Sequence, residues 1–189
     1  MKYDFWIVAI GSSAGGLNPL KEILSSLPGN ANAVYVLVSH LWAASTSNLD
    51  IILSKYSKLP IKKAYNGLIL NKNNIYIIPE NQMMTIEKGE LKLRVRRPEE
   101  IINNAVNIFF TSLAQDAHEK ALGIILSGGG QDGLLGAKEI HRHNGTVIVQ
   151  DPNTAEVPSM PYAVINEDHP KGIYSTKEIA DKISEITQN

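Results

Sequence analysis

Short apolar runs alternate with amphipathic stretches along the 189 residues of this chain. Val34–Ser39 is apolar on both faces, as strands buried between helices are, whereas the apolar residues from Val106 to Ala117 recur at helical spacing. This alternation predicts an α/β fold, in which a parallel sheet is covered by helices. The expected strands of the sheet are Phe5–Ile10, Val34–Ser39, Ile61–Tyr65, Leu122–Leu126 and Thr146–Gln150.

Polar residues and glycines predict where the helices begin and end. Asn18 can cap a helix after the first strand, and Pro19 suits its first position. Gly145 stands where a C′ residue would end the preceding helix. Ser175 and Glu178 have the spacing of a capping box, so we expect the last helix to start there.

One stretch departs from the alternation of strands and helices. Asn74–Ile78, Gln82–Ile86 and Glu90–Val95 are short strand patterns in close succession, and the residues between the last two can form a turn. We predict that this stretch is an antiparallel excursion, with a hairpin, inserted into the α/β chain. Because the sequence shows no repeat, low-complexity tract or linker, we expect residues 1–189 to form a single domain.

Composition and charge remove several classes of protein. The chain has 18 basic and 19 acidic residues and a net charge of −1, whereas a nucleic-acid-binding protein normally carries a basic excess. The absence of cysteine excludes disulfides, thiolate metal sites and a cysteine nucleophile. No signal peptide and no apolar run of the roughly 20 residues that span a membrane are present. We therefore expect a cytoplasmic protein without membrane insertion.

The turn after the first predicted strand carries the strongest sign of chemistry. Gly11, Ser13 and Gly15 match the Gly-x-Ser-x-Gly pattern that places a nucleophilic serine on a sharp strand-to-helix turn. The same turn could instead bind a phosphate at the helix N-terminus. A dinucleotide site would need Gly-x-Gly here and an acidic residue after the second strand, where this chain has His40. We therefore favour a nucleophile at Ser13, with Ser12 as a packing residue, and keep nucleotide binding as a lesser alternative.

Two further polar residues follow predicted strands. His40 follows the second strand, and Asp132 follows the strand that precedes the glycine run 128–130. If those strands are neighbours, their carboxyl ends bring Ser13, His40 and Asp132 into one cleft. The hydroxyl can then attack an acyl carbon, the imidazole can take and return the proton, and the carboxylate can orient the imidazole. The alternative for Asp132 is an ordinary N-cap of the helix that follows it.

The other histidines predict no metal site. His141 and His143 are two residues apart on a predicted helix, so their side chains point to different faces and cannot bind one metal ion together. We expect His118 near a helix C-terminus, where a positively charged imidazole suits the helix dipole.

Four segments have the order and spacing of one known family. They are Ala9–Gly16, Val38–His40, Ile125–Gly133 and the stretch from Val149–Pro152 through Ala155, Met160 and Pro161. With them the chain resembles the catalytic domain of the CheB family of chemotaxis protein-glutamate methylesterases. The resemblance covers nearly the whole chain, and it implies a three-layer, doubly wound, mostly parallel sheet flanked by helices, with an inserted antiparallel hairpin.

The resemblance also implies a serine hydrolase that demethylates γ-glutamyl methyl esters of chemoreceptor signalling helices and releases methanol, and some members deamidate receptor glutamines. By the same resemblance, Ser13 is the nucleophile, His40 the general base and Asp132 the third member of the triad. We further expect Ala14, Gly129 and Met160 in the oxyanion or substrate pocket. No metal ion or organic cofactor is implied.

Three features depart from the family's usual pattern. Pathway members usually carry an N-terminal receiver domain, whereas this chain begins with the catalytic strand and is expected to be a standalone form. Gly129 stands where the family usually has methionine, and Leu41 and Trp42 stand where Met-Pro often follows the histidine. The alternative function is therefore a family member that binds a protein partner but has lost efficient turnover.

Overall fold

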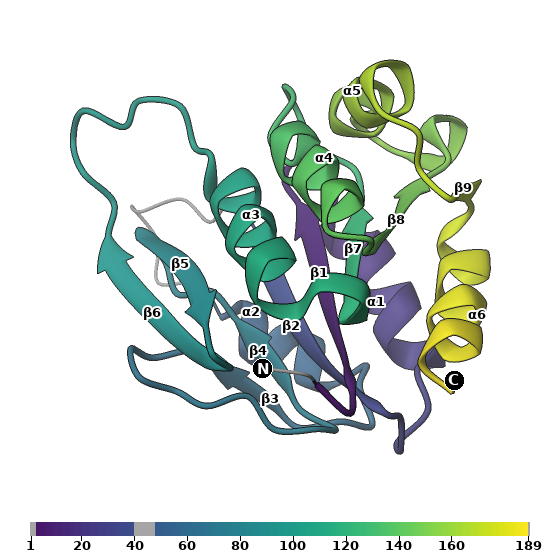
Figure 1. The fold of residues 1–189 in the computed structure, drawn as a ribbon. Helices are drawn as coiled ribbons and strands as arrows, with labels where there is room; N and C mark the ends of the chain where they lie inside the picture. The colour runs from purple at the N-terminus through teal and green to yellow at the C-terminus, as the bar shows by residue number, and fades with distance from the viewer. Residues whose placement is uncertain (1–2, 40–47, 189) are drawn as a thin grey trace.

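The computed structural model describes residues 3–39 and 48–188, and within them seven parallel strands form one sheet (Figure 1). The strands are β1 (Trp6–Ser12), β2 (Ala33–Ser39), β3 (Ile61–Lys63), β4 (Ile75–Ile77), β7 (Ala121–Ile125), β8 (Thr146–Gln150) and β9 (Gly172–Tyr174). They lie in the order β3-β4-β2-β1-β7-β8-β9. The predicted α/β fold class is confirmed.

The order of the strands reverses direction at β1. The chain runs from β1 to β2 and on toward one edge, then returns to place β7 on the other side of β1. Ser12 pairs with Ser39 at the end of β2, and Gly11 pairs with Ile125 at the end of β7. The carboxyl ends of β1, β2 and β7 therefore meet at the switch point, where doubly wound folds bind ligands.

Helices cover both faces of the sheet, which gives the three layers (Figure 1). They are α1 (Leu17–Ser26), α2 (Leu49–Ser54), α3 (Ala105–Ala117), α4 (Leu134–Arg142), α5 (Ser159–Glu167) and α6 (Thr176–Thr187), with short 3₁₀ turns at His118–Lys120 and Pro152–Thr154. Apolar residues of α1, α2 and α6 bury one face, and those of α3, α4 and α5 bury the other. Because β1 is buried on both sides, its apolar run shows no alternation with polar residues.

The antiparallel insertion consists of β5 (Gln82–Glu87) and β6 (Glu90–Val95) only. This hairpin packs against α3, where the backbone N–H of Ile86 donates to the Ser112 hydroxyl at 3.0 Å. The prediction that Asn74–Ile78 belongs to this excursion is wrong, because β4 pairs in parallel with both β2 and β3. Its three residues are all buried, as befits an internal strand of the main sheet.

Several boundaries differ from the predicted ones. The first helix starts at Leu17, so Pro19 lies within its first turn and Asn18 does not cap it. After α4, Asn144 occupies the C′ position with φ 62°, where Gly145 was predicted. Gly145 is the next residue, and its N–H donates to the Ile140 carbonyl at 2.8 Å. The predicted capping box at Ser175 is confirmed. Among residues 3–39 and 48–188, no helix is both long and apolar enough to cross a membrane.

Candidate active site

The turn that carries Ser13 is fixed by backbone hydrogen bonds. The Ser13 N–H donates to the Ser127 carbonyl at 3.0 Å, and the Gly16 N–H donates to the Ser13 carbonyl at the same distance. Gly15 has φ +75°, and a Cβ there would lie 2.6 Å from both Ser127 Oγ and Glu156 Cβ. The glycine of the motif is therefore needed both for its backbone conformation and for space.

Ser127 joins this turn to the loop that follows β7, and sequence reasoning missed it. Its side chain is fully buried, and its hydroxyl donates to the Ala14 carbonyl at 2.8 Å while accepting from the Val157 N–H at 3.0 Å. The Ser127 N–H donates to the side-chain oxygen of Gln150 at 2.9 Å. Both Ser127 and Gln150 are polar residues at the ends of otherwise apolar strands, and that position is the signal that could have identified them.

The glycine run lies directly against Ser13. A Cβ on Gly128 would come within 3.0 Å of Ser13 Cβ and 2.1 Å of Met160 Sδ, so only glycine fits there. Met160 is itself fully buried and packs beneath the run. Gly129 is exposed, and the nearest atom to a Cβ on it would be Val157 Cγ1 at 4.0 Å. The position therefore has room for a side chain larger than that of glycine.

Asp132 is a buried carboxylate held by backbone donors. Its side chain accepts from the Val106 N–H at 2.9 Å, the Asn107 N–H at 2.8 Å and the Gly133 N–H at 2.9 Å, and the residue is 5% exposed. The alternative that it caps the following helix is wrong. Gly133 is the N-cap of α4, and Asp132 instead binds the first turn of α3. The positive end of that helix stabilises the negative charge of the carboxylate.

The two adjacent serines of the turn have different environments. Ser12 is 1% exposed, and its hydroxyl lies 2.8 Å from the hydroxyl of Ser39, at the paired ends of β1 and β2. Ser13 is half-buried and follows β1. Solvent and ligands therefore reach Ser13 and not Ser12. His40 follows Ser39 directly in the sequence, and His40 and Trp42 lie outside the described residues, so their predicted places stay predictions.

A cavity of about 670 Å³ opens beside the glycine run and Asp132. Its walls come from the first turn of α3, the loop after β7, α4 and the end of α5. The lining includes Asn104, Asn107, Gly129, Gln131, Leu135 and Lys138. Ser13 is not among the lining residues, so the cavity lies on the Asp132 side of the glycine run.

The fold and the site define a class of α/β protein. Its marks are an accessible serine, Ser13, at the switch point of the sheet and a buried carboxylate, Asp132, that follows β7 and binds the N-terminus of a helix. The chain belongs to the CheB methylesterase family, whose model matches residues 8–183. The solved catalytic domain of the CheB methylesterase from Thermotoga maritima is 30% identical, covers 97% of this chain and 99% of its own, and superposes with a TM-score of 0.88.

Two relatives carry a name with two activities, protein-glutamate methylesterase and protein-glutamine glutaminase. A Leptospira interrogans protein, provisionally so named, is 31% identical over 100% of this chain and 97% of its own length. A Desulfitobacterium hafniense protein of the same name is also 31% identical, over 99% of this chain but 49% of its own length. This chain therefore spans the whole of one relative and about half of the other.

Proposed function

We propose that this protein is a serine esterase that hydrolyses γ-glutamyl methyl esters on the signalling helices of chemoreceptors and releases methanol. It also deamidates receptor glutamines, because an amide presents the same acyl carbon with ammonia as the leaving group. Membership of the CheB methylesterase family and the names of its relatives support the activity. The observation that carries it is the accessible Ser13 at the switch point, hydrogen-bonded through its backbone to the loop that leads to Asp132.

The reaction proceeds through an acyl-enzyme. The Ser13 hydroxyl attacks the ester carbonyl carbon while His40 takes its proton, and the tetrahedral intermediate collapses as His40 returns the proton to the departing methanol. A water molecule then attacks the acyl-enzyme by the same proton relay, which frees the glutamate carboxylate and restores Ser13. Asp132 orients His40 and stabilises its positive charge, and Asp132 itself stays fixed by the N–H groups of α3.

The developing negative charge needs hydrogen-bond donors close to the attacking oxygen. Ser13 is followed by Ala14 at the mouth of the turn and then by the N-terminus of α1, which begins at Leu17. We assign the oxyanion to backbone N–H groups of this turn, Ala14 first among them. Gly129 forms the exposed side of the pocket, and Met160 supports it from below through its contact with Gly128.

The proposed activity also implies how the receptor is bound and in which compartment the protein acts. The glutamyl side chain approaches Ser13 at the carboxyl end of β1, beside the glycine run, while the receptor helix stays outside on the surface of the protein. Residues 1–189 act as one catalytic domain, and they meet the cytoplasmic part of the receptor without entering the membrane.

Methanol release from a methylated receptor fragment tests the proposal. The Ser13→Ala variant should lose roughly 10⁴- to 10⁶-fold in rate, because the nucleophile is gone while the fold is kept. The matched control is Ser25→Ala, since Ser25 is an exposed serine of α1 whose hydroxyl bonds only within that helix. Full activity of Ser13→Ala would overturn the proposal. A wild-type protein that captures the receptor but releases no methanol would instead be a binding module.

A further inference from the structure

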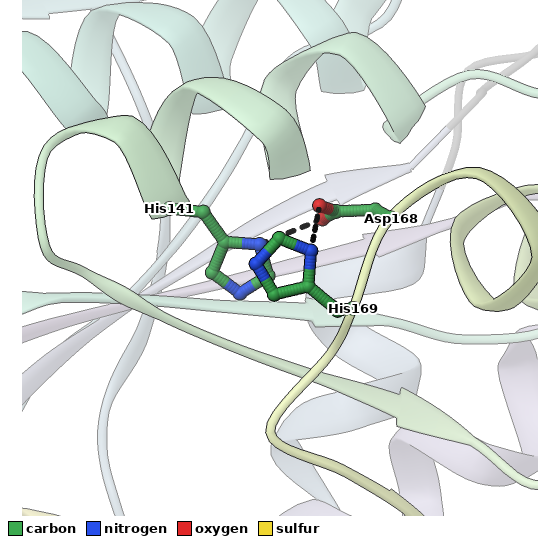
Figure 2. A group of neighbouring side chains, drawn as sticks. All are labelled: His141, Asp168 and His169. Carbon is green, nitrogen blue, oxygen red and sulfur yellow. Dashed lines mark ion pairs between the residues drawn. The ribbon is translucent and has the colours of Figure 1, made fainter.

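Three side chains with metal-binding atoms meet away from the proposed active site. His141 comes from the last turn of α4, Asp168 is the C-cap of α5, and His169 follows it (Figure 2). His141 Nδ1 lies 2.8 Å from Asp168 Oδ2, and His169 Nδ1 lies 3.5 Å from Asp168 Oδ1. One ligand atom from each of the three residues lies within 4.8 Å of the others.

The cluster leaves two of its polar atoms without ordinary hydrogen bonds. His141 Nδ1 and Asp168 Oδ2 are both buried, and neither meets hydrogen-bond geometry with any partner among the described residues, although they are 2.8 Å apart. The Asp168 side chain is 4% exposed. A buried carboxylate that is not satisfied by hydrogen bonds is unfavourable, and a bound cation between the two atoms removes that deficit.

The electrostatic surroundings also favour a positive charge. The C-terminal ends of α4 and α5 converge on the cluster, and each end carries the negative pole of its helix dipole. Lys138 and Arg142 lie nearby, and each is paired with a glutamate of its own, Lys138 with Glu167 at 3.4 Å and Arg142 with Glu139 at 2.5 Å. The carboxylate of Asp168 therefore faces two imidazoles at the C-terminal ends of two helices.

We propose that His141, Asp168 and His169 form a binding site for a divalent transition metal ion, with Zn²⁺ as the best match. Two imidazole nitrogens and one carboxylate oxygen are a donor set that zinc accepts, with water in the fourth place. Bonds of about 2.0–2.2 Å place tetrahedral ligands roughly 3.3–3.6 Å apart. The separation of 3.5 Å fits this, whereas that of 2.8 Å is shorter and must widen around the ion, and His169, at 89% exposed, has room to move onto it.

The sequence predicts no metal site, and this proposal departs from that prediction because its ligands come from two different helices. His141 and His143 do point apart, and His143 instead lies against His118 with ring centres 5.5 Å apart. The partners of His141 come from the end of α5, 27 positions further along the chain, and only the fold brings them together. The imidazole rings of His141 and His169 stack with their centres 4.8 Å apart. Figure 2 shows the carboxylate of Asp168 beside both rings.

A metal ion here has a structural role. It joins the C-terminal end of α4, which follows Asp132, to that of α5, which starts beside Met160. The ion would therefore hold together two helices whose other ends support the glycine run of the proposed active site. It takes no part in the ester hydrolysis.

Zinc titration of the untagged, chelator-treated protein tests the site by calorimetry. The wild type should bind one Zn²⁺ per chain, and Asp168→Asn and His169→Ala should each weaken binding at least about 10-fold, since loss of outer-shell partners alone has effects of about 10- to 100-fold. His118→Ala, another exposed histidine, is the matched control and should bind as the wild type does. Because His169 is almost fully exposed, its removal leaves the fold intact.

Zinc should also raise the thermal midpoint of the wild type and leave that of His169→Ala unchanged, because only the folded protein presents the site. Absence of zinc binding by the wild type would overturn the proposal, as would wild-type zinc affinity in His169→Ala or in Asp168→Asn. Neither outcome depends on methanol release, so this test stands apart from that of the esterase activity.

Discussion

Asp132 and Asp168 are both buried aspartates at helix ends, but at opposite poles. Asp132 binds the N-terminus of α3, and three backbone N–H groups donate to its carboxylate at 2.8 to 2.9 Å. Asp168 caps the C-terminus of α5, and its Oδ2 has no hydrogen bond among the described residues. Imidazole nitrogens of His141 and His169 lie 2.8 and 3.5 Å from its two oxygens.

The difference between the two aspartates indicates two different uses. Asp132 is stabilised by the protein backbone and needs no ion, so it can act on a neighbouring imidazole as a fixed negative charge. Asp168 lies at the C-terminal end of α5, where the helix dipole opposes its charge, and its partners are the imidazoles of His141 and His169, so a bound cation would stabilise it further. The same side chain therefore suits catalysis in one place and metal binding in the other.

Replacement of each aspartate by asparagine should separate catalysis from metal binding. The loss of methanol release in Asp132→Asn is the largest effect that we expect. Asp132→Asn should lower methanol release roughly 10⁴-fold, because a neutral amide neither orients nor stabilises the imidazolium. The zinc affinity of this variant should stay that of the wild type. Asp168→Asn should do the reverse, with weakened zinc binding and wild-type methanol release in zinc-free buffer.

The two assays are run on the same protein samples, with circular dichroism to verify folding. If Asp132→Asn kept wild-type activity, Asp132 would be only a cap of α3. If Asp168→Asn lost activity as completely as Asp132→Asn, the cluster would belong to the catalytic machinery and the contrast would fail.

A third carboxylate, Glu100, is half-buried at the surface and should give a smaller effect on stability. The Arg94 guanidinium donates to both of its oxygens at 2.8 and 2.6 Å, and this pairing lowers the pKa of Glu100 from 4.5 to about 2. The folded-state pKa is depressed, so the stabilisation is fully present above pH 4.5 and is lost as the pH falls through about 2.

Thermal melts of the wild type and Glu100→Gln across this pH range measure the effect. The difference in midpoint should be small at pH 6, since exposed ion pairs contribute little, and it should vanish towards pH 2. An equal difference at both pH values would mean that Glu100 stabilises the protein by packing and not by charge.

Local patterns in the sequence predicted most of the fold. The strand Thr146–Gln150 and the capping box at Ser175 were predicted to the residue, because both depend on neighbours in the chain. The strand β9 was not, since Gly172–Tyr174 is short and partly exposed. The helix α5 was not either, since two prolines flank its start and hide its pattern.

Contacts between distant segments could not be predicted from the sequence. The alternative that Asp132 caps the helix that follows it rested on neighbours in the chain, but two of its partners are 25 and 26 residues away in α3. His141 showed no partner at helical spacing, because Asp168 belongs to another helix. The motif at Ser13, in contrast, identified the accessible serine correctly, since strand, turn and helix are all local there.

If Ser13 is the nucleophile, a fluorophosphonate should react with its hydroxyl. Labelling followed by peptide mass spectrometry tests this role of Ser13 most directly. We predict one adduct, on Ser13, in the wild type and in Ser12→Ala, and none in Ser13→Ala. The adjacent Ser12 is the sharpest control because it shares the turn but is buried against Ser39. An adduct on Ser12, or methanol release by a protein that takes no label, would contradict the account.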